Sequence, residues 1–289
     1  MPGLGGDQNH FRWLARTLSH YGWPVVVLEH PGSDSKAVQA LLEGSLTLPG
    51  AEVIPGRLND LYSVLRYKKD GGIDVPGQNV ILIGHSLGSL TSFFASGATL
   101  DDQLDERCES VLDDLSLTNL SALLQCQMAD ISLPEVKGID GLSGLIGLNS
   151  FGSLLWPNDL STQVNVPIFL TGGTFDLITP ALSEQLGLLL AIKPNSLSRV
   201  LIIEGASHFS PIRVEGQMDQ KLGEDLFQLS ESLVGHHPLS VQSLLSSQII
   251  GFLESVENND PLPTKMSGVK NNLKYYILDR FTIKDILKD

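Results

Sequence analysis

The hydrophobic positions of this chain fall into short apolar runs that alternate with segments of helical spacing. Runs of the length of buried strands occupy residues 24–30, 80–83, 142–149, 167–171 and 199–203. Apolar residues that recur every three or four positions occupy 11–18, 61–67, 90–98, 181–191 and 239–257. Strands that alternate with helices predict an α/β fold, in which a mostly parallel sheet has helices on both faces.

Local signals place several of the helix ends. Asp7 is a candidate N-cap for the first helix, which Gly22 would end. Asn59 or Asp60 would cap the helix over 61–67, which ends near residues 70–72. Residues 37–42 add a short helix.

Two stretches depart from the alternation. Residues of about 101–138 begin with an acidic segment and contain two amphipathic helices, which predicts a helical insertion. This insertion either covers the mouth of a site as a cap or packs on the outside, and the sequence does not choose between them. Residues 1–257 then form the main domain, and 258–289 form a linker with a peripheral tail.

The strand over 80–83 leads into the motif Gly84-His85-Ser86-Leu87-Gly88, and a helix follows. A Gly-x-Ser-x-Gly turn between a strand and a helix is a nucleophile elbow, which holds its serine in strained geometry with the hydroxyl exposed. The glycines are needed because side chains beside the serine would collide with the strand or the helix. We therefore expect Ser86 to be a catalytic nucleophile.

A serine nucleophile needs a base, and the base needs a carboxylate that orients it. His208 follows the strand over 200–203 and Asp176 follows the strand over 168–171, so both lie where an open α/β sheet places its site. The chain order Ser86, Asp176, His208 is the order that this architecture uses. His85, inside the elbow, is expected to pack near the site rather than to transfer protons.

The oxyanion of the reaction needs two backbone N–H groups. Leu87, directly after the nucleophile, should supply one of them. The glycine-rich loop Gly3-Leu4-Gly5-Gly6 matches the source of the other, with Leu4 as the expected donor.

Composition narrows the possible partners. The net charge of −14 and the pI near 4.8 argue against nucleic acid and anionic membrane surfaces. The 289 residues contain no apolar run long enough for a transmembrane segment, and no signal peptide is visible, so a cytoplasmic location is the default for a compartment that the sequence leaves unknown. The sequence does not determine the oligomeric state either.

The chain has two cysteines, Cys108 and Cys126. They would pair if their helices form a hairpin, but two buried thiols are the default expectation. No His lies at zinc-ligand spacing to either one, and His10, His20 and His30 are scattered. We therefore expect no metal and no cofactor.

The elbow, the later Asp and His, and the Gly-Leu-Gly-Gly loop resemble the α/β-hydrolase superfamily over about residues 1–257. The nearest resemblance is to predicted bacterial esterases grouped with dienelactone hydrolases and platelet-activating-factor acetylhydrolases. It implies Ser86 as nucleophile, His208 as base, and the N–H groups of Leu4 and Leu87 as oxyanion donors.

The chain also departs from these relatives. The acetylhydrolases carry their acid one strand earlier, where this chain has Leu148-Asn149, so Asp176 must take that role. Dienelactone hydrolases use a cysteine nucleophile. In the superfamily three strands precede the oxyanion loop, and their absence would leave rows of backbone groups unpaired at about 1–3 kcal/mol each if buried. Either the flanking strands close up or the protein starts further upstream, and we favour an incomplete N-terminus.

The function expected from the sequence is a serine hydrolase that cleaves carboxylic esters through an acyl-enzyme. The leucines of the insertion favour a small-molecule ester with an apolar acyl or alcohol group. The alternative is a truncated hydrolase fold without efficient catalysis, which binds an apolar ligand or has no activity.

Overall fold

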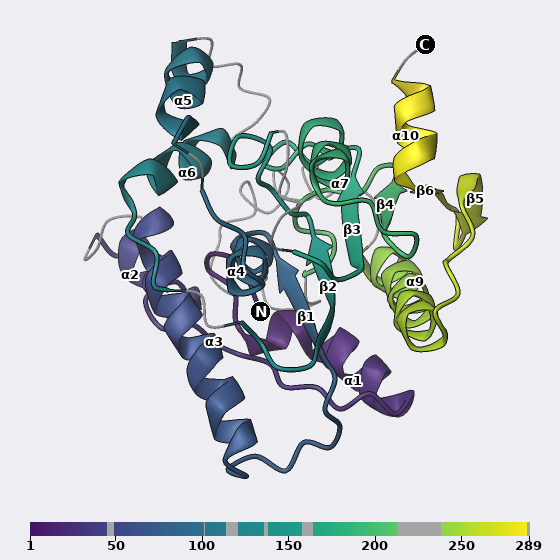
Figure 1. The fold of residues 1–289 in the computed structure, drawn as a ribbon, viewed down its shortest axis with the longest axis horizontal. Helices are drawn as coiled ribbons and strands as arrows, with labels where there is room; N and C mark the ends of the chain where they lie inside the picture. Colours follow the sequence, from purple (N-terminus) through teal and green to yellow (C-terminus); the bar gives the residue numbers. More distant parts are fainter. Residues whose placement is uncertain are drawn as a thin grey trace.

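A mixed sheet of six mostly parallel strands forms the centre of the protein, and helices surround it (Figure 1). The computed structural model describes residues 1–44, 49–100, 102–113, 121–135, 138–157, 164–212 and 238–287. The strands are β1 (Val80–His85), β2 (Leu142–Leu148), β3 (Ile168–Gly173), β4 (Arg199–Ile203), β5 (Lys265–Lys270) and β6 (Leu273–Leu278). Their order is β1-β2-β3-β4-β6-β5, and this confirms the predicted α/β class.

The strands β1 to β4 are parallel, so their carboxyl ends open at one edge of the sheet. Every residue of β3 and β4 is buried. This agrees with their uninterrupted apolar runs, which are typical of strands covered on both faces. The segments that follow β1, β3 and β4 contain Ser86, Asp176 and His208, and the sheet therefore brings these three residues to the same edge.

The sheet divides the apolar core into two layers, and helices cover the sheet on both faces. One layer joins α1 and α9 to the strands, and the other joins α3, α4, α7 and α10 to the opposite face. The α-helices of the described residues are α1 (Arg12–His20), α2 (Ser35–Leu42), α3 (Ile54–Lys69), α4 (Leu87–Ala95), α5 (Leu104–Asp113), α6 (Ser121–Gln127), α7 (Gly187–Ala191), α9 (Pro238–Asn258) and α10 (Arg280–Ile286).

Predicted helix ends are correct at the first helix, whereas at α3 the predicted end near residues 70–72 is correct and the predicted start is wrong. The Asp7 side chain accepts a hydrogen bond from the Asn9 N–H, and it caps a short 3-10 turn that continues into α1. Gly22 has φ of +86° just after α1. In contrast, α3 begins at Ile54, so Asn59 and Asp60 lie inside it. Pro55, whose fixed φ suits the first turn, starts this helix without a polar cap.

The strand predicted over residues 24–30 does not form. This segment has no regular secondary structure and is partly exposed, and it pairs with no strand of the described chain. As a result β1 is an edge strand of the sheet, and the segment has not closed up against it. Met1 lies beside β1, as the position of the N-terminus in Figure 1 shows.

The C-terminal residues join the sheet, which the predicted linker and peripheral tail did not anticipate. Strands β5 and β6 form a hairpin, and β6 pairs antiparallel with β4, on the side of the sheet far from β1. Tyr275 and Ile277 are buried there because they extend the core layer of α1 and α9. The hairpin thus protects the edge of β4 that would otherwise be open.

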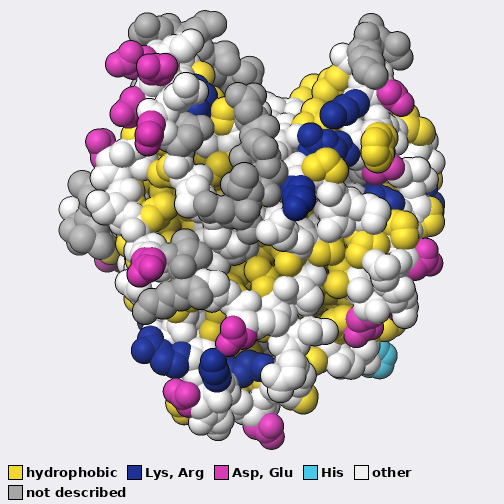
Figure 2. Space-filling view, in the orientation of Figure 1, with side chains coloured by type: hydrophobic (Ala, Val, Ile, Leu, Met, Phe, Trp, Pro, Cys, Tyr) yellow, Lys and Arg dark blue, Asp and Glu magenta, His cyan; other side chains and the backbone are white. Residues whose placement is uncertain are grey.

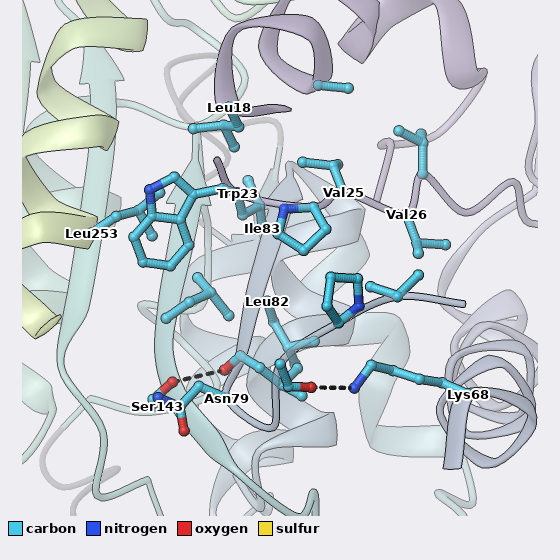
Figure 3. A pocket seen from close by; sticks show the side chains of 18 of the residues that line it. Leu18, Trp23, Val25, Val26, Lys68, Asn79, Leu82, Ile83, Ser143 and Leu253 are labelled. Atoms are coloured by element: carbon cyan, nitrogen blue, oxygen red, sulfur yellow. Dashed lines mark hydrogen bonds between the residues drawn. The ribbon is translucent and has the colours of Figure 1, made fainter. Parts of the chain in front are cut away.

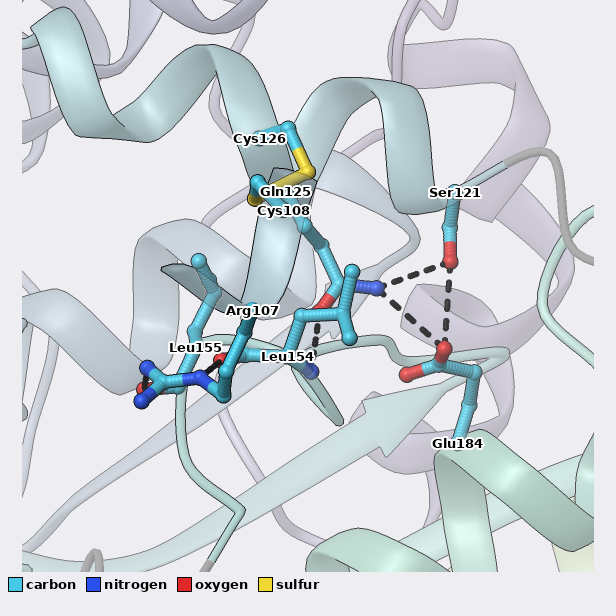
Figure 4. The surroundings of a disulfide bond; sticks show 8 residues. All are labelled: Arg107, Cys108, Ser121, Gln125, Cys126, Leu154, Leu155 and Glu184. Atoms are coloured by element: carbon cyan, nitrogen blue, oxygen red, sulfur yellow. Dashed lines mark hydrogen bonds between the residues drawn. A yellow bond between two sulfur atoms is a disulfide. The ribbon is translucent and has the colours of Figure 1, made fainter. Parts of the chain in front are cut away.

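The described parts of the insertion, residues 102–113 and 121–135, contain the two predicted helices α5 and α6. They are attached to the loops that leave the carboxyl ends of β2 and β3 (Figure 4). Buried Glu184 accepts hydrogen bonds from Ser121 and Gln125 of α6 and from the Gly152 and Ser153 N–H groups. These contacts place the insertion beside the edge of the sheet where the site lies.

Cys108 and Cys126 form a disulfide between α5 and α6, so the default of two free buried thiols is wrong. The two helices meet as a hairpin, which was the stated condition for pairing. Disulfides persist in oxidising compartments and are rare in the cytosol.

Removal of this disulfide should destabilise the protein. We expect the Cys108→Ala/Cys126→Ala variant to lose about 3 kcal/mol of unfolding free energy, because the bond closes a loop over a sequence separation of 18 residues. Urea unfolding measures the loss. Reductant should lower the stability of the parent chain by a similar amount and leave that of the variant unchanged; equal effects on both would contradict the assignment.

Acidic side chains gather over α5, in the upper left of Figure 2. Asp105, Glu106 and Glu109 are exposed there, whereas the same helix turns Leu104 and Cys108 inward. Within the described residues, no helix has both the length and the apolar character that crossing a bilayer requires.

Candidate active site

Ser86 occupies a sharp turn between β1 and α4, as the elbow motif predicts. Its φ of 51° and ψ of −120° are unusual for a residue with a side chain, and such a backbone stores about 1–3 kcal/mol of strain. A Cβ on Gly84 would lie 2.2 Å from the Gly88 carbonyl oxygen, and a Cβ on Gly88 would lie 2.2 Å from the Met1 carbonyl oxygen. Both glycines are therefore required by close backbone contacts.

His208 and Asp176 meet at the carboxyl ends of β4 and β3. His208 Nδ1 lies 3.0 Å from Asp176 Oδ2, and both side chains are buried. The hydrogen bond orients the imidazole, so that the opposite nitrogen Nε2 is the one left for a reacting group. The structure thus brings together two residues that lie 32 positions apart in the chain.

Asp176 is held as a carboxylate by several donors. Its Oδ1 accepts from the N–H groups of Ile178 and Thr179, and its Oδ2 accepts from Asn149 Nδ2 at 2.7 Å and Thr179 Oγ1 at 2.6 Å. Burial alone would raise the pKa of Asp176, but the charge of His208 and the hydrogen bonds from His208 and Thr179 outweigh it and lower that pKa.

His85 supports the loop that contains His208. Its Nε2 lies 2.9 Å from the His208 carbonyl oxygen, so the proton of the neutral ring is on Nε2. Burial, reinforced by the charge of His208, lowers the pKa of His85 to about 3. His85 packs near His208, as the sequence led us to expect, and as a neutral ring it holds the His208 loop in place.

Ser86 lies on the same edge, but the structure contains no hydrogen bond between its hydroxyl and His208. The two residues are linked through the side chain of His85, which precedes Ser86 and whose Nε2 contacts the His208 carbonyl oxygen. Hydrogen bonds between nucleophile and base are often long without substrate and tighten in the reactive complex. The structure therefore places Ser86 and the His208–Asp176 pair at the same edge of the sheet.

The glycine-rich loop predicted to supply an oxyanion donor lies against Ser86. A Cβ on Gly3 would be 3.0 Å from Ser86 Cβ, which shows how closely this backbone approaches the nucleophile. The loop is held by hydrogen bonds from Gly5 N–H to Ser33 and from Gly6 N–H to Gly3. The N–H groups of Leu4 and Leu87 have no acceptor within the described part of the chain. Both remain able to bind a developing oxyanion.

Arg57, on α3, holds this loop in place through hydrogen bonds. Its buried guanidinium donates to the Pro2 carbonyl, to Ser33 Oγ at 2.7 Å and to Thr91 Oγ1 at 3.0 Å. Burial lowers the pKa of Arg57 to about 9, although Asp60 opposes the shift. Arg57 therefore connects α3 and α4 to the start of the chain, and it positions the backbone on which Leu4 lies.

The sequence did not identify Arg57 or Thr179 as residues of the site. It also did not predict the hydrogen bond that Asn149 donates to Asp176. Asn149 directly follows β2 and has a positive φ of 47°, so its place at the end of a parallel strand was a usable signal. Arg57 and Thr179 gave no such signal, because their partners are distant in the chain or lie within a loop.

The buried histidine predicts how stability depends on pH. In the unfolded chain His85 takes up a proton near pH 6.5, whereas in the folded protein it resists protonation down to about pH 3. Stability should therefore fall as the pH drops below about 6.5, with His85 contributing about 2 kcal/mol between pH 6.5 and 5.

Urea unfolding at pH 7 and pH 5 tests this expectation. The His85→Gln variant should lose less unfolding free energy on acidification than the parent chain, since glutamine cannot take up the proton. His20, which is exposed on α1, provides the matched control His20→Gln. If the His85 variant kept the full pH dependence of the parent, the buried ring would not be its source.

Among the described residues, no three His, Cys, Asp or Glu side chains gather as metal ligands would. Comparison with models of known protein families gives no match, and no curated protein matches the sequence significantly.

Proposed function

We propose that this protein is a serine hydrolase of the α/β-hydrolase type, which cleaves carboxylic esters through an acyl-enzyme. The observation that carries the proposal is the hydrogen bond between His208 and Asp176, beside a serine in strained elbow geometry. A base oriented by a buried carboxylate next to such a serine has a direct chemical use in nucleophilic catalysis.

In the proposed reaction, His208 Nε2 takes the proton of the Ser86 hydroxyl while Ser86 Oγ attacks the acyl carbon. The N–H groups of Leu4 and Leu87 stabilise the resulting oxyanion. The tetrahedral intermediate collapses, the ester C–O bond breaks, and His208 returns its proton to the leaving alcohol. Water, deprotonated by His208, then attacks the acyl-enzyme and releases the acid and free Ser86.

Exposed apolar side chains beside the proposed catalytic groups favour an apolar substrate. Phe175 and Leu177 flank Asp176 and are 61% and 55% exposed, and Phe209, next to His208, is 46% exposed. Large apolar residues that are exposed together near a site are typical of a surface that binds an apolar ligand. We expect esters with medium-length acyl chains to react faster than acetate esters.

A fluorophosphonate probe tests the nucleophile. The parent chain should acquire one covalent adduct by intact mass, on the peptide that contains Ser86, and Ser86→Ala should acquire none. Ser19→Ala, a matched change at an exposed position of α1, should label like the parent. Labelling that persists in Ser86→Ala would contradict the proposal.

Turnover separates the substrate classes. Rates on p-nitrophenyl acetate, butyrate and octanoate, and on a thioester, a lactone and a peptide of matched acyl group, should be highest on the longer esters. Labelling without turnover of any of them would favour the alternative, a hydrolase fold with impaired catalysis.

A further inference from the structure

Glu184 is a buried acidic residue that lies beside the loop of Asp176. It belongs to η4 (Ala181–Leu186), a π-helical turn that follows this loop, and its side chain is fully buried. A buried carboxylate is costly unless hydrogen bonds satisfy it, and π-helical turns are frequent at functional sites. Both features make Glu184 a candidate for a role in the proposed reaction.

Five groups of the described chain donate hydrogen bonds to this carboxylate. Oε2 accepts from the N–H groups of Gly152 at 2.8 Å and Ser153 at 3.0 Å, which belong to the loop after β2. Oε1 accepts from Ser153 Oγ at 2.8 Å. It also accepts from Gln125 Nε2 at 3.2 Å and Ser121 Oγ at 3.3 Å, both on α6 (Figure 4). One side chain thus ties the loop after β2 to the insertion.

Gln185, the next residue of η4, binds the same loop. Its side chain is also buried, and its Nε2 donates to the Ser150 carbonyl at 2.8 Å. Glu184 and Gln185 together therefore hold the loop after β2 at three of its residues, which are Ser150, Gly152 and Ser153.

The two segments that η4 holds together are the ones that contact Asp176. Asn149, at the start of the loop after β2, donates to Asp176 Oδ2 at 2.7 Å. Thr179, just before η4, donates to both carboxylate oxygens of Asp176. If the loop after β2 moved away from η4, Asn149 would leave Asp176, whereas Thr179 would stay in contact with it.

The insertion holds the same loop one residue further along the chain. Arg107 Nε donates to the Leu154 carbonyl at 2.7 Å, and Gln125 Oε1 accepts from the Leu154 N–H at 2.8 Å. Arg107 and Gln125 each precede a cysteine of the disulfide that joins α5 to α6. The insertion therefore supports the loop after β2, which is a different role from covering the mouth of the site.

From these contacts we propose that Glu184 is a positioning residue for Asp176. Its carboxylate keeps the loop after β2 in place, so that Asn149 stays hydrogen-bonded to the Asp176 oxygen that orients His208. The inference rests on the proposed hydrolase function, because the orientation of His208 affects the rate only if His208 is the base.

Glu184→Gln tests the proposal, because glutamine has nearly the same shape but presents an N–H group to donors that need an acceptor. We expect kcat and kcat/KM on p-nitrophenyl butyrate to fall equally, by about 20-fold, with KM within about twofold of the parent value. Glu254→Gln, at an exposed position of α9, is the matched control and should react like the parent. Lower stability with an unchanged kcat would contradict the proposal, because a purely structural role has that result.

A double-mutant cycle identifies the route from Glu184 to Asp176. Asn149→Gly removes the side-chain donor to Asp176, and glycine accepts the positive φ of 47° at this position. If Glu184 acts through Asn149, the double variant Glu184→Gln/Asn149→Gly should lose no more kcat than the more severe single variant. Losses that multiply would overturn the proposal, since Glu184 would then act by another route.

Ser153→Ala provides the test if Glu184→Gln does not fold. It removes one hydrogen bond to Oε1 and leaves both N–H groups on Oε2, so kcat should fall about threefold at unchanged KM. The control is Ser143→Ala, because Ser143 Oγ donates to the Val80 carbonyl at the opposite end of β2. Ser143 lines a cleft of about 670 Å³ between β1 and residues 23–28, and none of the proposed catalytic residues lines this cleft (Figure 3). An equal loss of kcat in both serine variants would contradict the proposal.

Proton NMR provides a readout that needs no turnover. The Nδ1 proton of His208, which is hydrogen-bonded to Asp176, should give a resonance at low field that Asp176→Asn removes. Glu184→Gln should shift this resonance upfield, and Glu254→Gln should leave it in place. The same shift in a parent chain that hydrolyses no ester would disprove the hydrolase function and leave the positioning by Glu184 standing. An unchanged resonance in Glu184→Gln would overturn the positioning role.

Discussion

Replacement of Asp176 by asparagine is expected to lower kcat by about 10⁴-fold on a p-nitrophenyl ester. The carboxylate holds the His208 ring with its proton on Nδ1 and stabilises the imidazolium that forms when the serine proton is taken. An amide of the same size keeps the hydrogen-bond geometry but lacks the charge, and it can stabilise the wrong tautomer. Circular dichroism should show that Asp176→Asn remains folded.

The neighbouring Asn149 allows a sharper version of the experiment. Its side-chain nitrogen lies 2.7 Å from the Asp176 oxygen that contacts His208, so the two side chains converge on one point from adjacent strands. The double variant Asn149→Asp/Asp176→Asn exchanges the carboxylate and the amide. We expect it to recover part of the activity lost in Asp176→Asn, since a negative charge again lies beside His208.

The single variant Asn149→Asp is the matched control for this exchange. It places two carboxylates in contact, and repulsion between them should raise the pKa of the pair and weaken the charge that orients His208. Its activity should therefore fall below that of the parent. A loss in Asp176→Asn of less than about tenfold would contradict the role of Asp176 as the orienting acid.

Replacement of Gly88 by alanine should be the most destabilising small change in the elbow. The added Cβ would lie 2.2 Å from the Met1 carbonyl and 2.7 Å from the Pro2 carbonyl, and both atoms belong to backbone that cannot turn away. We expect a loss of about 3 kcal/mol or more in unfolding free energy, with esterase activity lost because the loop before Leu4 is displaced.

Gly56 offers the control, because it lies in the first turn of α3 and a Cβ there would meet no atom within 4 Å. Gly56→Ala should stabilise the protein by up to about 1 kcal/mol, since alanine is the better helix former. Urea unfolding of the two variants gives the comparison directly. A Gly88→Ala protein as stable as Gly56→Ala would mean that the chain start does not pack against the elbow.

The sequence predicted the features that depend on a short run of residues and missed those that depend on contacts between distant segments. The parallel strands, α4 after the elbow and the order of Ser86, Asp176 and His208 depend on short runs of residues, and the pattern indicated all of them. The prediction of a strand over residues 24–30 was wrong, because an apolar run forms a strand only when a neighbouring strand is present to pair with it. The C-terminal hairpin was missed because its pairing with β4 joins residues more than 70 positions apart.

For the candidate site, the sequence by itself determined the chemistry of the residues and the ends of strands on which they lie. The elbow glycines, Ser86, Asp176 and His208 could be named from motif and spacing, because a tight turn and a strand end leave local marks. The tertiary structure alone decided what surrounds them. Arg57 beneath the first loop, Asn149 beside Asp176 and the disulfide of the insertion are contacts between distant segments. The edge position of β1 is also a property of the assembled sheet, since a strand's own residues do not specify which neighbour pairs with it.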